Sequence, residues 1–190
     1  QFDAAVAAYD TALELYGEED NSRWFVHYTR AIAHFQLDQW PNAEADFRAA
    51  LALNPDQPQV LNFLGYSLVE RKEKLDEALQ MIETAVEARP ENGAIVDSLG
   101  WVYFQLERYE DAVEPMEKAA ALEATDPVIN DHLGDVYWAV GRKIEASFQW
   151  QRALSFEPDE ELADRIRLKL EIGLDAVLEQ EGADPIRVAD

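Results

Sequence analysis

One short phrase occurs three times in the middle of this chain: Leu64-Gly65-Tyr66, Leu99-Gly100-Trp101 and Leu133-Gly134-Asp135. The glycine of the phrase therefore recurs every 34 or 35 residues. A second phrase, which ends in alanine, follows each copy: Asp76-Glu77-Ala78, Glu110-Asp111-Ala112 and Ile144-Glu145-Ala146. A repeat of this length predicts a solenoid, because one short repeat cannot bury its apolar face until its neighbours stack on it.

The small residues of the two phrases predict where helices approach each other closely. Glycine in the first phrase would let the first helix of a repeat lie close to the second, and alanine in the second phrase would do the same from the other side. Large side chains fill the remaining space: Ile82, Met116 and Trp150. The pattern is typical of tightly packed helix pairs.

The period and the alternation of small and large residues resemble those of the tetratricopeptide repeat (TPR) family. The resemblance extends from Gln1 to about Glu160 and implies an all-α fold, a right-handed superhelical α-solenoid of helix-turn-helix repeats. We expect one domain over 1–181 and a tail over 182–190. Within the domain we expect the second helix of a truncated repeat, four full repeats and a capping helix, at 1–17, 24–57, 58–92, 93–126, 127–160 and 161–181. Because the chain begins within a repeat, we expect it to be a fragment of a longer protein.

In the TPR family the first helix of each repeat lines a concave groove, so the resemblance implies candidate binding residues at the matching positions. They are Tyr28, Phe35, Asn62, Tyr66, Asp97, Trp101, Phe104, Asp131, Asp135 and Trp138. The polar members could hydrogen-bond a peptide backbone, and exposed aromatic members could hold apolar side chains. The alternative is that the aromatic side chains contact the next repeat and belong to the core.

The charge of the chain restricts its partners. A formal net charge of −23 argues against nucleic acid and anionic membrane surfaces. It favours a neutral-to-basic protein or peptide with apolar anchors, although acidity can also serve solubility alone. The candidate groove positions hold no lysine or arginine, and Asp97, Asp131 and Asp135 would repel a C-terminal carboxylate. No apolar run approaches the roughly 18 residues of a membrane span, so we expect no direct membrane insertion.

The sequence offers no set of residues for catalysis. It has no cysteine, and its three histidines, His27, His34 and His132, show no metal-ligand spacing with a carboxylate. No glycine-rich phosphate loop and no nucleophile elbow is present. We predict a non-catalytic protein that uses neither a cofactor nor a metal.

The wording of the repeats, from Leu61 to Leu68 and again around Gly100 and Gly134, is also similar to the C-terminal repeats of long TPR proteins of Gram-negative bacteria. Some of those are outer-membrane lipoproteins, including adaptors that bring substrates to a periplasmic protease. This resemblance implies the periplasm or outer membrane as the location, with the cytoplasm as the alternative. Our leading hypothesis is a scaffold that binds a partner in its groove. The alternatives are a spacer or self-association module, which would form a homo-oligomer, and a protease adaptor.

Overall fold

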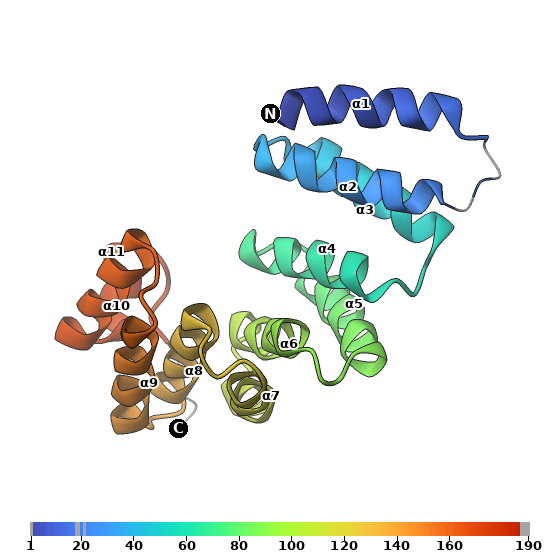
Figure 1. Cartoon of the computed structure of the whole chain (residues 1–190). Coiled ribbons are helices and arrows are strands. Elements are labelled where there is room, and N and C mark those ends of the chain that lie inside the picture. Colours follow the sequence, from blue (N-terminus) through green and yellow to red (C-terminus); the bar gives the residue numbers. More distant parts are fainter. Residues whose placement is uncertain (1, 18–19, 21, 187–190) are drawn as a thin grey trace.

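A computed structural model describes residues 2–17, 20 and 22–186 of the chain. Over these residues the structure consists of α-helices and contains no strand, which confirms the predicted all-α class (Figure 1). The helices are α1 (Phe2–Leu15), α2 (Arg23–Gln36), α3 (Trp40–Leu53), α4 (Pro58–Glu70), α5 (Leu75–Ala88), α6 (Gly93–Gln105), α7 (Tyr109–Leu122), α8 (Pro127–Ala139), α9 (Lys143–Ser155), α10 (Glu160–Ile172) and α11 (Leu174–Gln180). Of the predicted tail, residues 187–190 lie outside the described part.

The helices form consecutive pairs that follow one another along a curved path (Figure 1). Each predicted full repeat holds one pair: α2 with α3, α4 with α5, α6 with α7, and α8 with α9. The helix α1 packs on α2, in the place of a preceding second helix. The first helices of the pairs, α2, α4, α6 and α8, are the elements on which the predicted groove residues lie.

The close approach predicted at the repeated glycines is confirmed. A Cβ atom would lie 2.8 Å from Ile82 Cγ1 at Gly65, 2.5 Å from Met116 Cγ at Gly100, and 2.4 Å from the Trp150 ring at Gly134. No real Cβ atom tolerates such distances, so each first helix rests directly on a large side chain of its second helix. This contact fixes the spacing within each pair.

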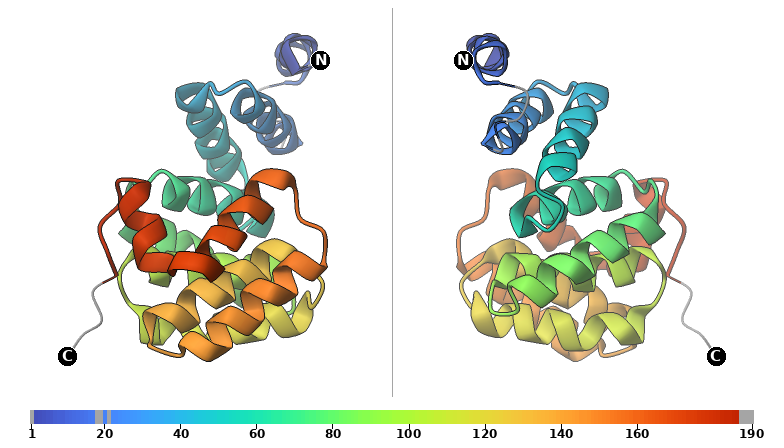
Figure 2. Two further views of the ribbon diagram at one scale, coloured as in Figure 1. Left: turned by 90° about the vertical axis from the view of Figure 1, so that its left-hand side faces the viewer. Right: turned by 90° about the vertical axis from the view of Figure 1, so that its right-hand side faces the viewer.

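The structure corrects the prediction of a single capping helix over 161–181. The range is divided into α10 and α11 at Gly173, whose backbone has φ +84°, a left-handed conformation that favours glycine. A side chain at Gly173 would also meet Trp138, since a Cβ atom there would lie 2.7 Å from Trp138 Cη2. The left view of Figure 2 shows α10 and α11 meeting at a sharp angle at the C-terminal end of the solenoid. We call them the C-terminal helix pair.

None of the helices within the described ranges combines the length and the apolarity that crossing a membrane requires.

Candidate functional site

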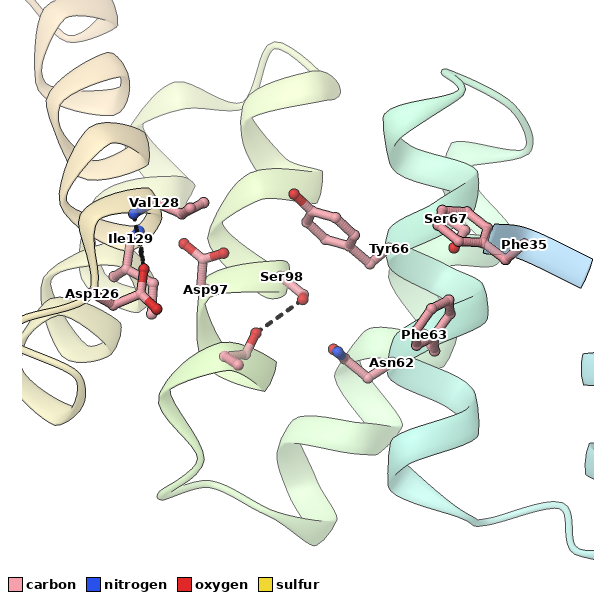
Figure 3. A pocket seen from close by; sticks show the side chains of 11 residues that line it. Phe35, Asn62, Phe63, Tyr66, Ser67, Asp97, Ser98, Asp126, Val128 and Ile129 are labelled. Carbon is pink, nitrogen blue, oxygen red and sulfur yellow. Dashed lines mark hydrogen bonds between the residues drawn. The ribbon is translucent and has the colours of Figure 1, made fainter. Parts of the chain in front are cut away.

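A pocket of about 350 Å³ opens between the first helices of consecutive repeats (Figure 3). We call it the groove pocket. It begins at the C-terminal end of α2, runs past α4 and α6, and ends at the N-terminal turn of α8. Its walls are formed by Phe35, Asn62, Phe63, Tyr66, Ser67, Ala94, Asp97, Ser98, Asp126, Val128 and Ile129. The pocket thus lies on the face of the solenoid where the groove was expected.

Helix α4 supplies the polar side of the groove pocket from two successive turns. Asn62 and Tyr66 are four residues apart, so they stand one above the other on the same face of the helix. Both side chains extend from α4 toward α6 (Figure 3). Burial, together with the negative charges of Glu70 and Asp97, raises the pKa of Tyr66 far above its ordinary value of 10.0. The Tyr66 hydroxyl therefore stays neutral, and the carboxylate of Glu70 is already a hydrogen-bond partner for it.

The carboxamide of Asn62 is the unusual feature of the pocket. Its Oδ1 atom is buried and accepts no hydrogen bond from the described residues. A buried polar atom without a partner costs on the order of 1–3 kcal/mol, and such atoms are uncommon in folded proteins. An incoming donor, such as the N–H of a peptide backbone, would satisfy it.

The groove pocket also has apolar walls. Phe35 packs edge-on against Phe63 with 5.4 Å between ring centroids, and Phe63 in turn contacts Phe47 at 5.0 Å. Phe35 at 39% exposure and Val128 at 40% exposure are among the most exposed large apolar residues described. Apolar side chains of a ligand could cover Phe35 at the α2 end and Val128 at the α8 end, which would remove this surface from water.

The acidic residues of the groove pocket are already engaged in the fold. Asp126 caps α8, since its Oδ1 accepts hydrogen bonds from the backbone N–H groups of Val128 and Ile129 at 2.8 and 3.0 Å (Figure 3). Asp97 is buried and lies 3.0 Å from His132 Nδ1. These carboxylates still make the local potential negative, but neither is a free ion-pairing group.

Of the predicted groove residues, Phe35, Asn62, Tyr66 and Asp97 come together in this pocket. Tyr28 does not reach it and packs on Phe47 instead, with 6.2 Å between ring centroids.

The expectation that Trp101 and Phe104 are exposed is wrong. Each is only 8% exposed. Trp101 stacks on Phe104 on one side and on His132 on the other, with centroid distances of 4.8 and 4.0 Å. Its indole N–H donates to Glu70 Oε1 at 2.6 Å. These rings belong to the core between α6 and α8, which was the alternative interpretation.

The expectation of free acidic groups at Asp131 and Asp135 is also wrong. Both are buried, and the ammonium group of Lys169 in α10 lies 2.7–2.8 Å from all four of their carboxylate oxygens. Asp135 also accepts a hydrogen bond from the indole of Trp150 at 2.9 Å. Burial and the neighbouring charge of Asp135 raise the pKa of Asp131.

Trp138, the last predicted residue, is half-buried. Its indole N–H donates to Asp175 of α11 at 2.9 Å. The C-terminal helix pair therefore contacts all three of the residues predicted to line a groove on α8, which are Asp131, Asp135 and Trp138.

Sequence reasoning missed Phe63, Ser67 and Ser98 of the groove pocket and the basic partner Lys169. Phe63 and Ser67 each follow a predicted residue directly, so a wider stripe on the first helices would have included them. The role of Lys169 could not be predicted in this way, because its partners lie in a different helix. The nearby Arg165 and Arg167 are also basic, so the sequence did not indicate which of the three residues would pair with them.

The groove pocket has both polar and apolar walls. Across the described ranges, no group of three or more histidine, aspartate or glutamate side chains is placed to hold a metal ion. The pocket combines the unpaired acceptor of Asn62, the neutral hydroxyl of Tyr66 and the exposed ring of Phe35. Groups of these kinds can contact a peptide.

Comparisons with known proteins agree with the repeat fold. Family models of the tetratricopeptide repeat match residues 24–57 and 70–127. TPR repeat-containing protein PA4667 of Pseudomonas aeruginosa is 32% identical over 105 residues, which is 55% of this chain and only 17% of that relative. The chain thus spans a small part of the curated relative it matches.

Solved structures show the same fold. TTC0263, a thermophilic TPR protein of Thermus thermophilus, matches with a TM-score of 0.70 and 24% identity, over 90% of this chain and 91% of that one. YrrB, described as a TPR protein with an unusual peptide-binding site, matches with a TM-score of 0.67 and 20% identity, over 88% and 84%.

Proposed function

We propose that this chain, in which models of the tetratricopeptide repeat match residues 24–57 and 70–127, is a non-catalytic scaffold that holds an extended segment of a partner protein in the groove pocket. Proteins of this repeat architecture generally serve as protein-interaction scaffolds. The observation that carries the proposal is the unpaired, buried Oδ1 of Asn62 in the same pocket as the exposed ring of Phe35. The Asn62 oxygen would accept a hydrogen bond from a backbone N–H of the partner, and the Phe35 ring would contact an apolar side chain of the partner.

The chemistry of the partner segment follows from the pocket. One apolar anchor residue would cover Phe35, a second would reach Val128 at the other end of the pocket, and a backbone N–H between them would reach Asn62. Neutral or basic flanking residues are favoured, because Asp97 and Asp126 line the pocket and the whole chain carries a net charge of −23. A partner segment that ends in a carboxylate at this point is disfavoured for the same reason.

A display library of random peptides tests the proposal. Peptides enriched on the wild-type chain would be synthesised and titrated against wild type, Asn62→Ala and Phe35→Ala. We expect each substitution to weaken binding by about tenfold, since a lost hydrogen bond or apolar contact of roughly 1.4 kcal/mol has this effect. The control is Leu15→Ala, which removes an exposed apolar side chain from α1, outside the pocket.

Two results would refute the groove pocket as the binding site. One is a set of enriched peptides that bind both variants as tightly as wild type. The other is the failure of any peptide to enrich above a surface without protein.

A second candidate function, self-association, is favoured by the outer face of α9. Ile144 and Phe148 lie one helical turn apart there, and they are 73% and 64% exposed. Adjacent exposed apolar side chains of this size often mark an interface between proteins. If this face joins two copies, sedimentation of the wild-type chain will show a dimer that the Phe148→Glu variant lacks.

We also propose the bacterial cell envelope as the location of the protein, on the basis of the sequence similarity of its repeats alone. A relative from Pseudomonas aeruginosa is consistent with a bacterial origin. Fractionation of cells that express the full-length protein would test the location.

A further inference from the structure

The C-terminal helix pair occupies the second half of the face whose first half contains the groove pocket. In the repeat alignment, Asp131 and Asp135 of α8 stand where Asn62 and Tyr66 stand in α4. In α4 these positions line an open pocket, whereas in α8 they are covered by α10. The same structural positions therefore serve two different contacts at the two ends of the solenoid.

The contact to α8 recognises a specific charged group. The side chain of Lys169 has 0% exposure, and its ammonium group lies within 2.7–2.8 Å of both carboxylates. A buried ammonium is stable only when it is paired and hydrogen-bonded. Arg165 lies farther from the same carboxylates, at 3.8–3.9 Å, and bonds Glu181 instead. The site therefore selects a lysine at a defined place.

A second contact lies one turn farther along α8. The indole of Trp138 donates to Asp175, and its ring lies against the backbone of Gly173. Asp131, Asp135 and Trp138 form one stripe on α8, because they are separated by four and three residues. The ligand of this stripe is thus a helix that carries a lysine, followed six residues later by a carboxylate.

The C-terminal helix pair fills this half of the face incompletely. A space of about 370 Å³ remains between Trp101 and Phe104 on one side and Leu178 and Glu181 on the other. The chain before the helix pair, Phe156 to Asp159, has no helical structure and contains Pro158. It could change direction without breaking a helix.

We propose that Asp131, Asp135 and Trp138 form a second binding site, specific for a lysine-bearing helix, in which the C-terminal helix pair is an exchangeable resident ligand. The occupant that replaces it is the same helix pair of a second copy of this chain. A second copy fits because it repeats every contact that the resident pair makes, so that only the connecting residues 156–159 must change conformation.

The second binding site on α8 and the groove pocket of the proposed function are formed by different residues. Asn62 and Phe35 take no part in the contact, so the failure of either proposal leaves the other in place.

The test uses a fluorescently labelled synthetic peptide of residues 159–186 and the full chain. Lys169→Met in the chain removes the resident ammonium and keeps an apolar stem of similar length, which weakens the resident pair. We expect the wild-type peptide to bind the Lys169→Met chain at least about tenfold more tightly than it binds the wild-type chain. A Lys169→Met peptide should lose this binding.

Arg167→Met is the matched control, because Arg167 lies on the same helix, is exposed and pairs only locally with Asp164. The chain with this substitution should bind the peptide as wild type does. The proposal is overturned if the peptide binds the Lys169→Met and Arg167→Met chains equally, or if the two peptides bind alike.

Hydrogen exchange of the wild-type chain tests the same proposal without any variant, so it remains decisive if Lys169→Met fails to fold. An exchangeable segment must open while the rest of the solenoid stays folded. We expect the amides of α10 and α11 to exchange at least about tenfold faster than those of α8 and α9. Equal exchange rates in all four helices would overturn the proposal.

Discussion

The ring of Trp101 lies flat against the ring of His132, with centroids 4.0 Å apart and planes 10° from parallel. The contact joins α6 to α8, and Phe104 covers the other face of the tryptophan. His132 is held from its edge by Asp97, 3.0 Å away. This arrangement packs one repeat against the next, and it explains why an aromatic residue at a predicted groove position is unavailable to a ligand.

The first prediction concerns the pH dependence of this contact. Burial by itself lowers the pKa of His132, but the charge of Asp97 and its hydrogen bond outweigh burial, so the pKa is raised above its ordinary value of 6.5. Because the folded state binds this proton more tightly than the unfolded state, the pair stabilises the fold fully below about pH 6.5. That contribution is lost as the pH rises through the raised pKa.

Urea unfolding at several pH values checks this prediction. The difference in unfolding free energy between wild type and His132→Gln should shrink as the pH rises above about 6.5 and through the raised pKa of His132. A difference that stays constant over this range would show that the proton on His132 has no part in the stability.

The second prediction concerns the contact between Gly134 and Trp150. In an exposed helix, Gly→Ala is stabilising by roughly 0.5–1 kcal/mol. At position 134, however, the new Cβ atom would lie 2.4 Å from the fully buried ring of Trp150, and overpacking of this kind costs about 1–3 kcal/mol. We therefore expect Gly134→Ala to destabilise the chain in thermal unfolding. Gly17→Ala, where nothing lies within 4 Å, is the control that should leave the melting temperature unchanged.

The third prediction concerns the ion pairs that hold α1 to the solenoid. Arg30 bonds the buried Asp46 of α3 through two nitrogens and Asp10 of α1 through a third, all at 2.6 Å. Arg30→Met leaves Asp46 with His27 as its nearest partner, at 2.9 Å. Removal of one partner from a buried pair costs roughly 3–5 kcal/mol, and we expect the lower end because His27 remains.

Two measurements check the Arg30 prediction together. The urea midpoint of Arg30→Met should fall, and hydrogen exchange in α1 should accelerate more than exchange in α8. The exposed Arg89 provides a control, since Arg89→Met should change neither quantity. If α1 keeps its protection in Arg30→Met, the ion pairs do not hold it in place.

The fourth prediction concerns the hydrogen bond between Trp138 and Asp175. Trp138→Phe keeps an aromatic ring but removes the N–H that donates at 2.9 Å. A hydrogen bond to a charged acceptor contributes about 1.5–3 kcal/mol. Exchange of the α11 amides should therefore accelerate, while exchange in α4 and α5 stays as in wild type. Unchanged exchange in α11 would mean that this hydrogen bond contributes nothing to the attachment of α11.

The sequence was sufficient to predict the fold because the decisive signals are local and repeated. Glycine at 65, 100 and 134 faces a large residue 16 or 17 positions later in every copy, and the structure has these contacts. The turns within the pairs were less visible. Asp38, Lys72 and Glu107 adopt positive φ values of 54–59° there without being glycine. Because these three residues are not glycine, their identity in the sequence did not indicate the left-handed conformation.

The groove was predictable at one end and not at the other. Asn62 and Tyr66 line a pocket because nothing distant covers α4 at that point. Asp131 and Asp135 lie on the corresponding face of α8, but the residue that neutralises them is 38 and 34 positions away, on a helix outside the repeat pattern. The repeat pattern predicts the contacts between neighbouring repeats. It does not predict the contacts of a terminal helix that lies outside the pattern and folds back on the last repeat.

The separation between Asp131 and Lys169 has a consequence for synthesis of the chain. A ribosome that adds roughly 5–20 residues per second finishes Asp131 about 2–8 s before Lys169. For that time the two carboxylates of α8 have no ammonium between them, and the last repeat cannot close in its final form. Earlier repeats acquire their partners as they emerge, whereas the last one must wait for residues that are made after it. A ribosome that pauses within α10 would therefore hold the nascent chain with its final repeat open and accessible to chaperones.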